Sequence, residues 1–126
     1  MSRVIFVGDN PSKTNVRQDV AFVGAKCFDR LIGWIKYLDP DYYICLNSTS
    51  QTDLDKIVDL YTNGFKVIAL GSKASERLDN LNVVHFKLIH PSGRNRLIND
   101  EKYVRRELKR AYDYIHNTFV GSVDFE

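Results

Sequence analysis

The chain has little cysteine and no long apolar stretch, and each shortage excludes a class of protein. Its two cysteines, Cys27 and Cys45, exclude a disulfide scaffold and any site with four cysteine ligands, and they suit a reducing compartment. No stretch approaches the roughly 18 apolar residues of a membrane span. The opening run Val4–Val7 reaches Gly8 and Asp9 too soon for a signal peptide. We therefore expect an intracellular, cytoplasmic protein of prokaryotic or viral type, with no membrane partner; a nuclear location stays open.

Net charge is also small. The 18 lysines and arginines are opposed by 16 aspartates and glutamates, which leaves a formal net charge of +2. This balance excludes a protein that coats a polyanion with its whole surface, so any nucleic-acid interface must be local. The sequence has neither a Walker A nor a GxGxxG phosphate loop. No linker or repeat divides it, so residues 1–126 are expected to form one globular domain.

Hydrophobic periodicity predicts alternating strands and helices. Short apolar runs predict four buried strands, at Val4–Val7, Tyr42–Leu46, Lys66–Leu70 and Val83–Leu88. Apolar residues at helical spacing predict four helices, at Gly24–Tyr37, Thr52–Thr62, Ser72–Leu78 and Asn99–His116. Continuous apolar strands separated by helices favour an α/β fold of three layers (α/β/α), with a four-stranded parallel sheet covered on both faces. Right-handed crossovers favour the strand order 2-1-3-4.

Polar loops follow all four predicted strands, where ligands bind in open parallel sheets. Turn formation and helix capping account for some of these residues, because Gly64 suits a left-handed helix end and Ser72 suits an N-cap. Capping accounts poorly for the first and fourth loops. An Asp-Asn-Pro sequence at 9–11 and a histidine followed by two arginines at 90–96 are not needed to cap a helix.

Five motifs together are distinctive: GDNPS (8–12), AFVGAKCFDRL (21–31), YICLNS (43–48), VIALGSKAS (67–75) and HPSGRNR (90–96). In this order, and covering most of the chain, they resemble the uracil-DNA glycosylase superfamily, most of all its compact family-4 and family-5 members. The resemblance implies a monomeric, monofunctional N-glycosyl hydrolase that needs no cofactor and no metal. Such an enzyme removes uracil, or a related deaminated or modified pyrimidine, from DNA in base-excision repair.

The resemblance implies catalytic roles for three residues. Asn10 falls where the family orients or activates the attacking water, and an asparagine there is similar to the mismatch-specific branch. Because an amide cannot take up a proton at neutral pH, Asn10 would position water without acting as a base. Asp9 is the alternative base, or else a carboxylate at a helix N-terminus. His90 would lie beside uracil O2 and stabilise the negative charge that develops as the glycosidic bond breaks.

Base binding is implied for Gly8, Phe22 and Asn47. Gly8 opens the first motif. Phe22 matches the aromatic residue on which the flipped base stacks, although a phenylalanine near a helix start can also be a core residue. Asn47 matches the residue that donates to uracil O4 and accepts from N3–H, a pattern that rejects cytosine. Alternatively, Asn47 caps the turn that follows it.

Contacts to DNA are expected from five residues around the same cleft: Ser12, Ser92, Arg94, Arg96 and Lys73. Arg94 stands where the family has a leucine that wedges into the base stack. Unlike family-4 members, the chain lacks the cysteines for an iron–sulfur cluster, and its two thiols are expected to be buried. The basic residues of the last helix are either a solvated face, partly paired with Glu101 and Glu107, or a phosphate-binding surface.

Two other functions remain open from the sequence. One is a glycosylase-like binding protein with little or no catalysis, which recognises a modified base, an abasic site or single strands. The other is a small-nucleotide enzyme on a flavodoxin-like sheet. DNA binding separates the last from the first two, and turnover separates an enzyme from a binding protein.

Overall fold

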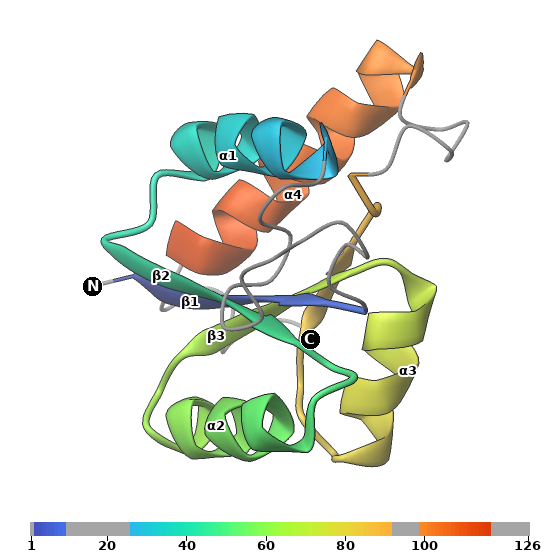
Figure 1. Cartoon of the computed structure of the whole chain (residues 1–126). Helices are drawn as coiled ribbons and strands as arrows, with labels where there is room; N and C mark the ends of the chain where they lie inside the picture. Colours follow the sequence, from blue (N-terminus) through green and yellow to red (C-terminus); the bar gives the residue numbers. More distant parts are fainter. Residues whose placement is uncertain (1, 10–25, 92–98, 117–126) are drawn as a thin grey trace.

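The computed structural model describes residues 2–9, 26–91 and 99–116 (Figure 1). Strands and helices alternate along them: β1 (Arg3–Gly8), α1 (Lys26–Leu38), β2 (Tyr42–Asn47), α2 (Gln51–Thr62), β3 (Lys66–Leu70), α3 (Ser72–Asn80), β4 (Phe86–Leu88) and α4 (Glu101–His116). The strands form one parallel sheet in the order β2-β1-β3-β4. The predicted α/β class, parallel sheet and strand order are confirmed. None of the described helices is long and apolar enough to cross a membrane.

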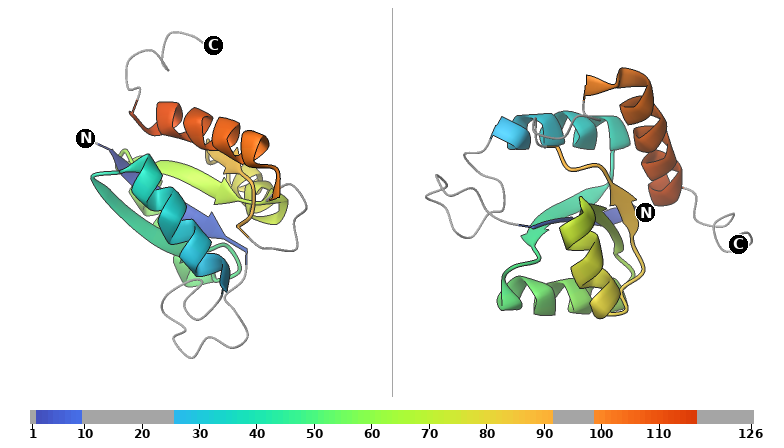
Figure 2. Two further views of the ribbon diagram at one scale, coloured as in Figure 1. Left: turned by 90° about the horizontal axis from the view of Figure 1, so that it is seen from above. Right: turned by 90° about the vertical axis from the view of Figure 1, so that its right-hand side faces the viewer.

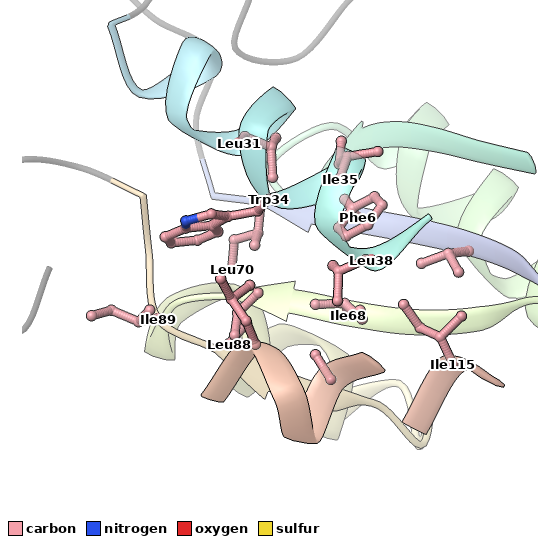
Figure 3. Packing of buried hydrophobic residues seen from close by; sticks show 13 residues of the cluster. Phe6, Leu31, Trp34, Ile35, Leu38, Ile68, Leu70, Leu88, Ile89 and Ile115 are labelled. Carbon is pink, nitrogen blue, oxygen red and sulfur yellow. The ribbon is translucent and has the colours of Figure 1, made fainter. Parts of the chain in front are cut away.

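The sheet is covered on both faces, as its continuously apolar strands require. Figure 2 shows α1 and α4 on one face and α2 and α3 on the other. Along β1, Val4 and Phe6 pack with the first pair of helices, whereas Ile5 and Val7 pack with the second pair. On the α1 and α4 side, Trp34 of α1 belongs to the same cluster as the strand residues Phe6, Ile68 and Leu70 (Figure 3). The alternation of a strand therefore supplies both layers of the core.

The fourth strand is shorter than predicted. It begins at Phe86 rather than at Val83, because the backbone before it is bonded elsewhere. The N–H of Val83 donates to the Leu78 carbonyl (3.0 Å), and the N–H of Val84 donates to the Tyr61 hydroxyl (3.3 Å). Residues 83–85 thus form a loop that is tied to the ends of α2 and α3.

One predicted helix end is confirmed and another is wrong. Gly64 follows the C-cap of α2 with a φ of 96°, in the left-handed region that glycine adopts without strain. At α3 the N-cap is Gly71 and not Ser72, and no side chain caps this helix. The N–H of Gly71 donates to the Leu88 carbonyl (2.9 Å), which continues the β3–β4 pairing by one residue and makes Gly71 the point where the chain turns into α3.

The core makes a direct stability prediction. Replacing Ile68, which is fully buried in the central part of the sheet, with alanine is expected to lower the free energy of unfolding by about 2–5 kcal/mol, because it leaves a cavity. The same change at Val84, which is 66% exposed, is the control and should alter it by less than about 0.5 kcal/mol. Urea denaturation measures both, and equal losses would contradict this packing.

Candidate functional site

The carboxyl ends of the four strands lie along one edge of the sheet and bring chemically useful residues together. Gly8 is paired with Asn47, at the ends of β1 and β2. Beyond that pair, the N–H of Ser48 donates to the Gly8 carbonyl (2.7 Å). Asp9 follows β1, and His90 lies two residues beyond the end of β4. The edge therefore carries a carboxylate, an amide, a hydroxyl and an imidazole on a rigid backbone.

The side chain of His90 lies against Gly71, the residue that follows β3. A Cβ atom at position 71 would lie 3.2 Å from the Cβ of His90, and the φ of Gly71 is 97°, so both the space and the backbone favour glycine. Burial lowers the pKa of His90 below 6.5, and the negative charge of Asp9 opposes this shift in part. The imidazole is therefore neutral at pH 7 and can donate a hydrogen bond through one of its nitrogens.

Asp9 is in contact with Arg77 of helix α3. Its Oδ1 lies 3.5 Å from Nε of Arg77, and its side chain is only 15% exposed. The two groups attract each other as charges, but the contact is not a hydrogen bond, since Asp9 Oδ1 has no hydrogen-bond partner within the described part of the chain. The carboxylate of Asp9 thus lies beside the guanidinium of Arg77 and is near enough to His90 for its charge to raise the pKa of the imidazole, and its Oδ1 is left to accept a proton or a hydrogen bond.

Asn47 forms a turn with the residues that follow it. Its Oδ1 accepts from the N–H (3.0 Å) and the hydroxyl (2.8 Å) of Thr49, and its own backbone N–H donates to Asp53 (2.8 Å). The turn-capping interpretation is therefore confirmed. Because the N–H of Thr49 can only donate, it fixes which atom of the amide is the oxygen. Thr49 occupies both lone pairs of that oxygen, and the NH2 group takes no part in this turn.

Two buried side-chain atoms stand out in this region. Among the described residues, the buried polar side-chain atoms without a hydrogen-bond partner are Asp9 Oδ1 and Ser48 Oγ. Ser48 is completely buried. An unpaired buried polar group costs about 1–3 kcal/mol, so such groups are rare unless they have a role.

Several predicted site residues lie outside the described residues: Asn10, Ser12, Phe22, Ser92, Arg94 and Arg96. Of the predicted DNA contacts, Lys73 is described. It is exposed on the first turn of α3, two residues after Gly71 and one turn before Arg77. The structure thus brings together Gly8, Asp9, Asn47 and His90 along one edge, with Lys73 beside them.

The basic residues of α4 are partly paired within the helix. Arg105 lies 4.0 Å from Glu101, and Arg110 lies 3.1 Å from Glu107. Arg106 lies 3.8 Å from the same Glu107. The expected partial pairing is confirmed, which favours the solvated-face interpretation of this helix.

Cys45 is a free thiol that is only partly buried, where a buried one was predicted, and burial raises its pKa to about 11. It is therefore unreactive at neutral pH. The side chain of Cys27 lies outside the described residues. Within the described ranges, no cluster of histidine, cysteine and acidic residues is suited to a metal ion.

Residues that the sequence analysis did not select also build this edge. Nη1 of Arg30 donates to the Pro91 carbonyl (2.7 Å) and ties α1 to the segment after β4. Arg77 pairs with Asp9, and Ser48 places its hydroxyl inside the protein. The predicted pairing of β1 with β2 could have identified Ser48, because Ser48 follows Asn47 as Asp9 follows Gly8. Arg77 carried no signal, since its partner is 68 positions away (77 against 9).

A pocket of about 440 Å³ lies elsewhere, around the end of α3. It is lined by Asp79, Asn82, Val83, Val84 and His85, none of which was predicted as a site residue. Nδ1 of His85 donates to the Val83 carbonyl (2.8 Å), so its Nε2 accepts from the Ser75 hydroxyl (2.7 Å) when the ring is neutral. These bonds hold the 83–85 loop against α3. Ser75, which makes one of them, is not among the residues that line the pocket.

No family model, curated protein or solved structure matches this chain.

The charges around His90 predict how it titrates. An NMR pH titration is expected to give a pKa below 6.5 for His90, because burial disfavours the charged ring. Asp9→Asn should lower that pKa further, because it removes the negative charge of Asp9, which raises it. Asp59→Asn, an exposed site on α2, is the matched control and should leave it unchanged. A pKa above 6.5, or no response to Asp9→Asn, would contradict this arrangement.

The lowered pKa of His90 also makes the free energy of unfolding depend on pH. Well above pH 6.5 His90 is neutral in both the folded and unfolded chains, so it adds no pH dependence to the free energy of unfolding. As the pH falls from 6.5 through the lowered pKa, the unfolded chain binds the proton first and the fold loses stability. His90→Gln is expected to remove this part of the pH dependence in urea denaturation, and an unchanged profile would show that His90 does not cause it.

Proposed function

We propose that this chain is a DNA glycosylase of the uracil-DNA glycosylase type, which hydrolyses the N-glycosidic bond of uracil or a related modified pyrimidine in DNA. One observation carries the proposal. The carboxyl edge of a parallel sheet of order 2-1-3-4 gathers Gly8, Asp9, Asn47 and His90, which come from three of the five motifs that suggested the family. Ligands of open parallel sheets bind at this edge.

His90 is suited to stabilise the departing base. As the bond between C1′ of the sugar and N1 of uracil breaks, its electron pair passes to the base and negative charge develops at O2. A neutral imidazole N–H donates a hydrogen bond to that oxygen, and its energy is larger in a partly buried site than in water. The lowered pKa of His90 keeps the ring neutral at pH 7. The side chain of His90 lies against Gly71, where an added Cβ atom would come within 3.2 Å of the Cβ of His90.

Asp9 is suited to be the base that activates water. Water forms a bond to C1′ through its oxygen, and one of its protons passes to the carboxylate, so the products are an abasic sugar and the free base. Oδ1 of Asp9 is available for that proton, and Arg77 balances its charge. Asn10, beside it in the sequence, would help to hold the water, because an amide can donate and accept hydrogen bonds but cannot act as a base.

Asn47 would read the base with its NH2 group. Both lone pairs of its Oδ1 are used by Thr49, so the expected acceptance from uracil N3–H is not available while this turn persists. The NH2 group alone still distinguishes the two pyrimidines. It donates to O4 of uracil, whereas cytosine presents an amino group at that position, and two donors would be opposed. Discrimination against cytosine therefore rests on one hydrogen bond.

The remaining contacts are to phosphates. Lys73, with Ser12, Ser92, Arg94 and Arg96, would hold the strand on either side of the flipped nucleotide. These contacts are independent of sequence and should weaken steeply as the salt concentration rises.

The test is base excision from oligonucleotides with one central uracil, single-stranded or opposite guanine or adenine, followed by alkaline cleavage. Wild type is expected to cleave, and His90→Ala to slow base release by about 100- to 1000-fold, the usual cost of losing one donor to a developing anion. Asp9→Asn should cost at least about 100-fold. His116→Gln, at a histidine on α4 far from this edge in the sequence and fold, is the control and should keep the wild-type rate.

Each other outcome has a definite meaning. If wild type cleaves no uracil substrate but binds DNA in a salt-sensitive way, uracil excision is wrong. A glycosylase-like protein that recognises a modified base, an abasic site or single strands then replaces it. If the protein binds free nucleotides and not DNA, both of these functions are wrong.

A further inference from the structure

We propose that Ser48 is a water-positioning residue of this edge, and that its hydroxyl and Asp9 Oδ1 together hold the water that attacks the sugar. This inference rests on the proposed glycosylase function, and it gives a role to Ser48, the last residue of the motif YICLNS (43–48), to which the resemblance assigned none. Its starting point is that these two oxygens are the buried side-chain polar atoms left without a hydrogen-bond partner in the described ranges.

The sheet brings the two residues to the same level. Val7 is paired with Leu46, and Gly8 with Asn47, in parallel strands. The bond from the Ser48 N–H to the Gly8 carbonyl (2.7 Å) carries this pairing past the ends of the strands. Asp9 and Ser48 are the next residues of the two neighbouring segments.

They also point to the same face. Neighbouring residues of parallel strands project to the same side, and side chains alternate along each strand. Val7 and Leu46 both pack against α2 and α3. Two residues further along, Asp9 and Ser48 are expected on that face, and the contact of Asp9 with Arg77 of α3 agrees with this (3.5 Å). The two unpaired oxygens therefore belong to one small polar site beneath the edge.

The chemistry of the two oxygens suits a nucleophilic water. A buried water needs at least two polar partners. Asp9 Oδ1 accepts one of its protons and is the acceptor of that proton in the reaction. The Ser48 hydroxyl oxygen accepts the other. With both protons bound, a lone pair of the water is directed away from them, towards C1′ of the sugar whose base is flipped into the site.

The nearby Ser50 provides the contrast. Its hydroxyl accepts from the N–H of Asp53 (3.2 Å) and caps α2. The Ser48 hydroxyl has no such structural bond, although it is more deeply buried. Removing the Ser48 hydroxyl should therefore lower the rate and not the stability. Removing the Ser50 hydroxyl should lower the stability and not the rate.

The experiment compares single-turnover base release and melting temperature for wild type, Ser48→Ala, Ser50→Ala, Asp9→Asn and the double variant Ser48→Ala/Asp9→Asn. Ser48→Ala is expected to slow release by about 10- to 100-fold, the effect of misplacing a reactant. Its affinity for the oligonucleotide and its melting temperature should not fall. Ser50→Ala should lower the melting temperature and keep the rate. The double variant should be no slower than Asp9→Asn, because both residues act on one water.

Three results would overturn the role of Ser48 while the glycosylase stands. These are a wild-type rate in Ser48→Ala, a fall in its melting temperature as large as that of Ser50→Ala, and a double variant whose rate is the product of the two single losses. If wild type itself releases no base, the proposed function fails and this inference fails with it. The two failures are thus distinguished by the wild-type measurement.

Discussion

The parallel pairing of β1 with β2 on one side and β3 on the other is the interaction on which the rest of the molecule depends. Because β1 is paired along both edges and its side chains are buried on both faces, Val4 to Val7 are fixed in the centre of the protein. That pairing sets Gly8 beside Asn47 and carries Asp9 and Ser48 to the same level. A slip of one residue would turn every side chain to the other face.

The carboxyl edge of the sheet contributes less to the stability of the fold than the core does. This contrast is typical of a functional site. The core apolar side chains are packed in two layers, whereas the edge holds a carboxylate with one buried unpaired oxygen, a buried unpaired hydroxyl and a glycine at positive φ. Such features lower stability and persist where they have a role. Arg77 and Arg30 offset part of the cost, since one neutralises Asp9 and the other anchors the segment after β4.

Most of the fold could be predicted from the sequence because periodicity reports burial directly. The predicted third strand, Lys66–Leu70, has the observed bounds. The start of β4 was wrong because Val83 is buried without joining the sheet, and apolar character alone cannot distinguish the two cases. The site was harder. The edge positions of Asp9 and His90 follow from topology, but the hydrogen bonds of Asn47 with Thr49 and the ion pair of Asp9 with Arg77 depend on side-chain directions that no local pattern encodes.

The most direct test of the edge as a nucleobase site is to map the backbone amide shifts of the labelled protein by NMR, while a single-stranded oligonucleotide with one uracil is added. If the base enters at the carboxyl ends of the strands, the largest shifts will be at Gly8, Asn47, Ser48 and Gly71. They will be absent with an oligonucleotide that has cytosine at the same position. Largest shifts around the pocket at Asp79–His85, or along α4, would show that the ligand binds elsewhere and would contradict the site described at this edge.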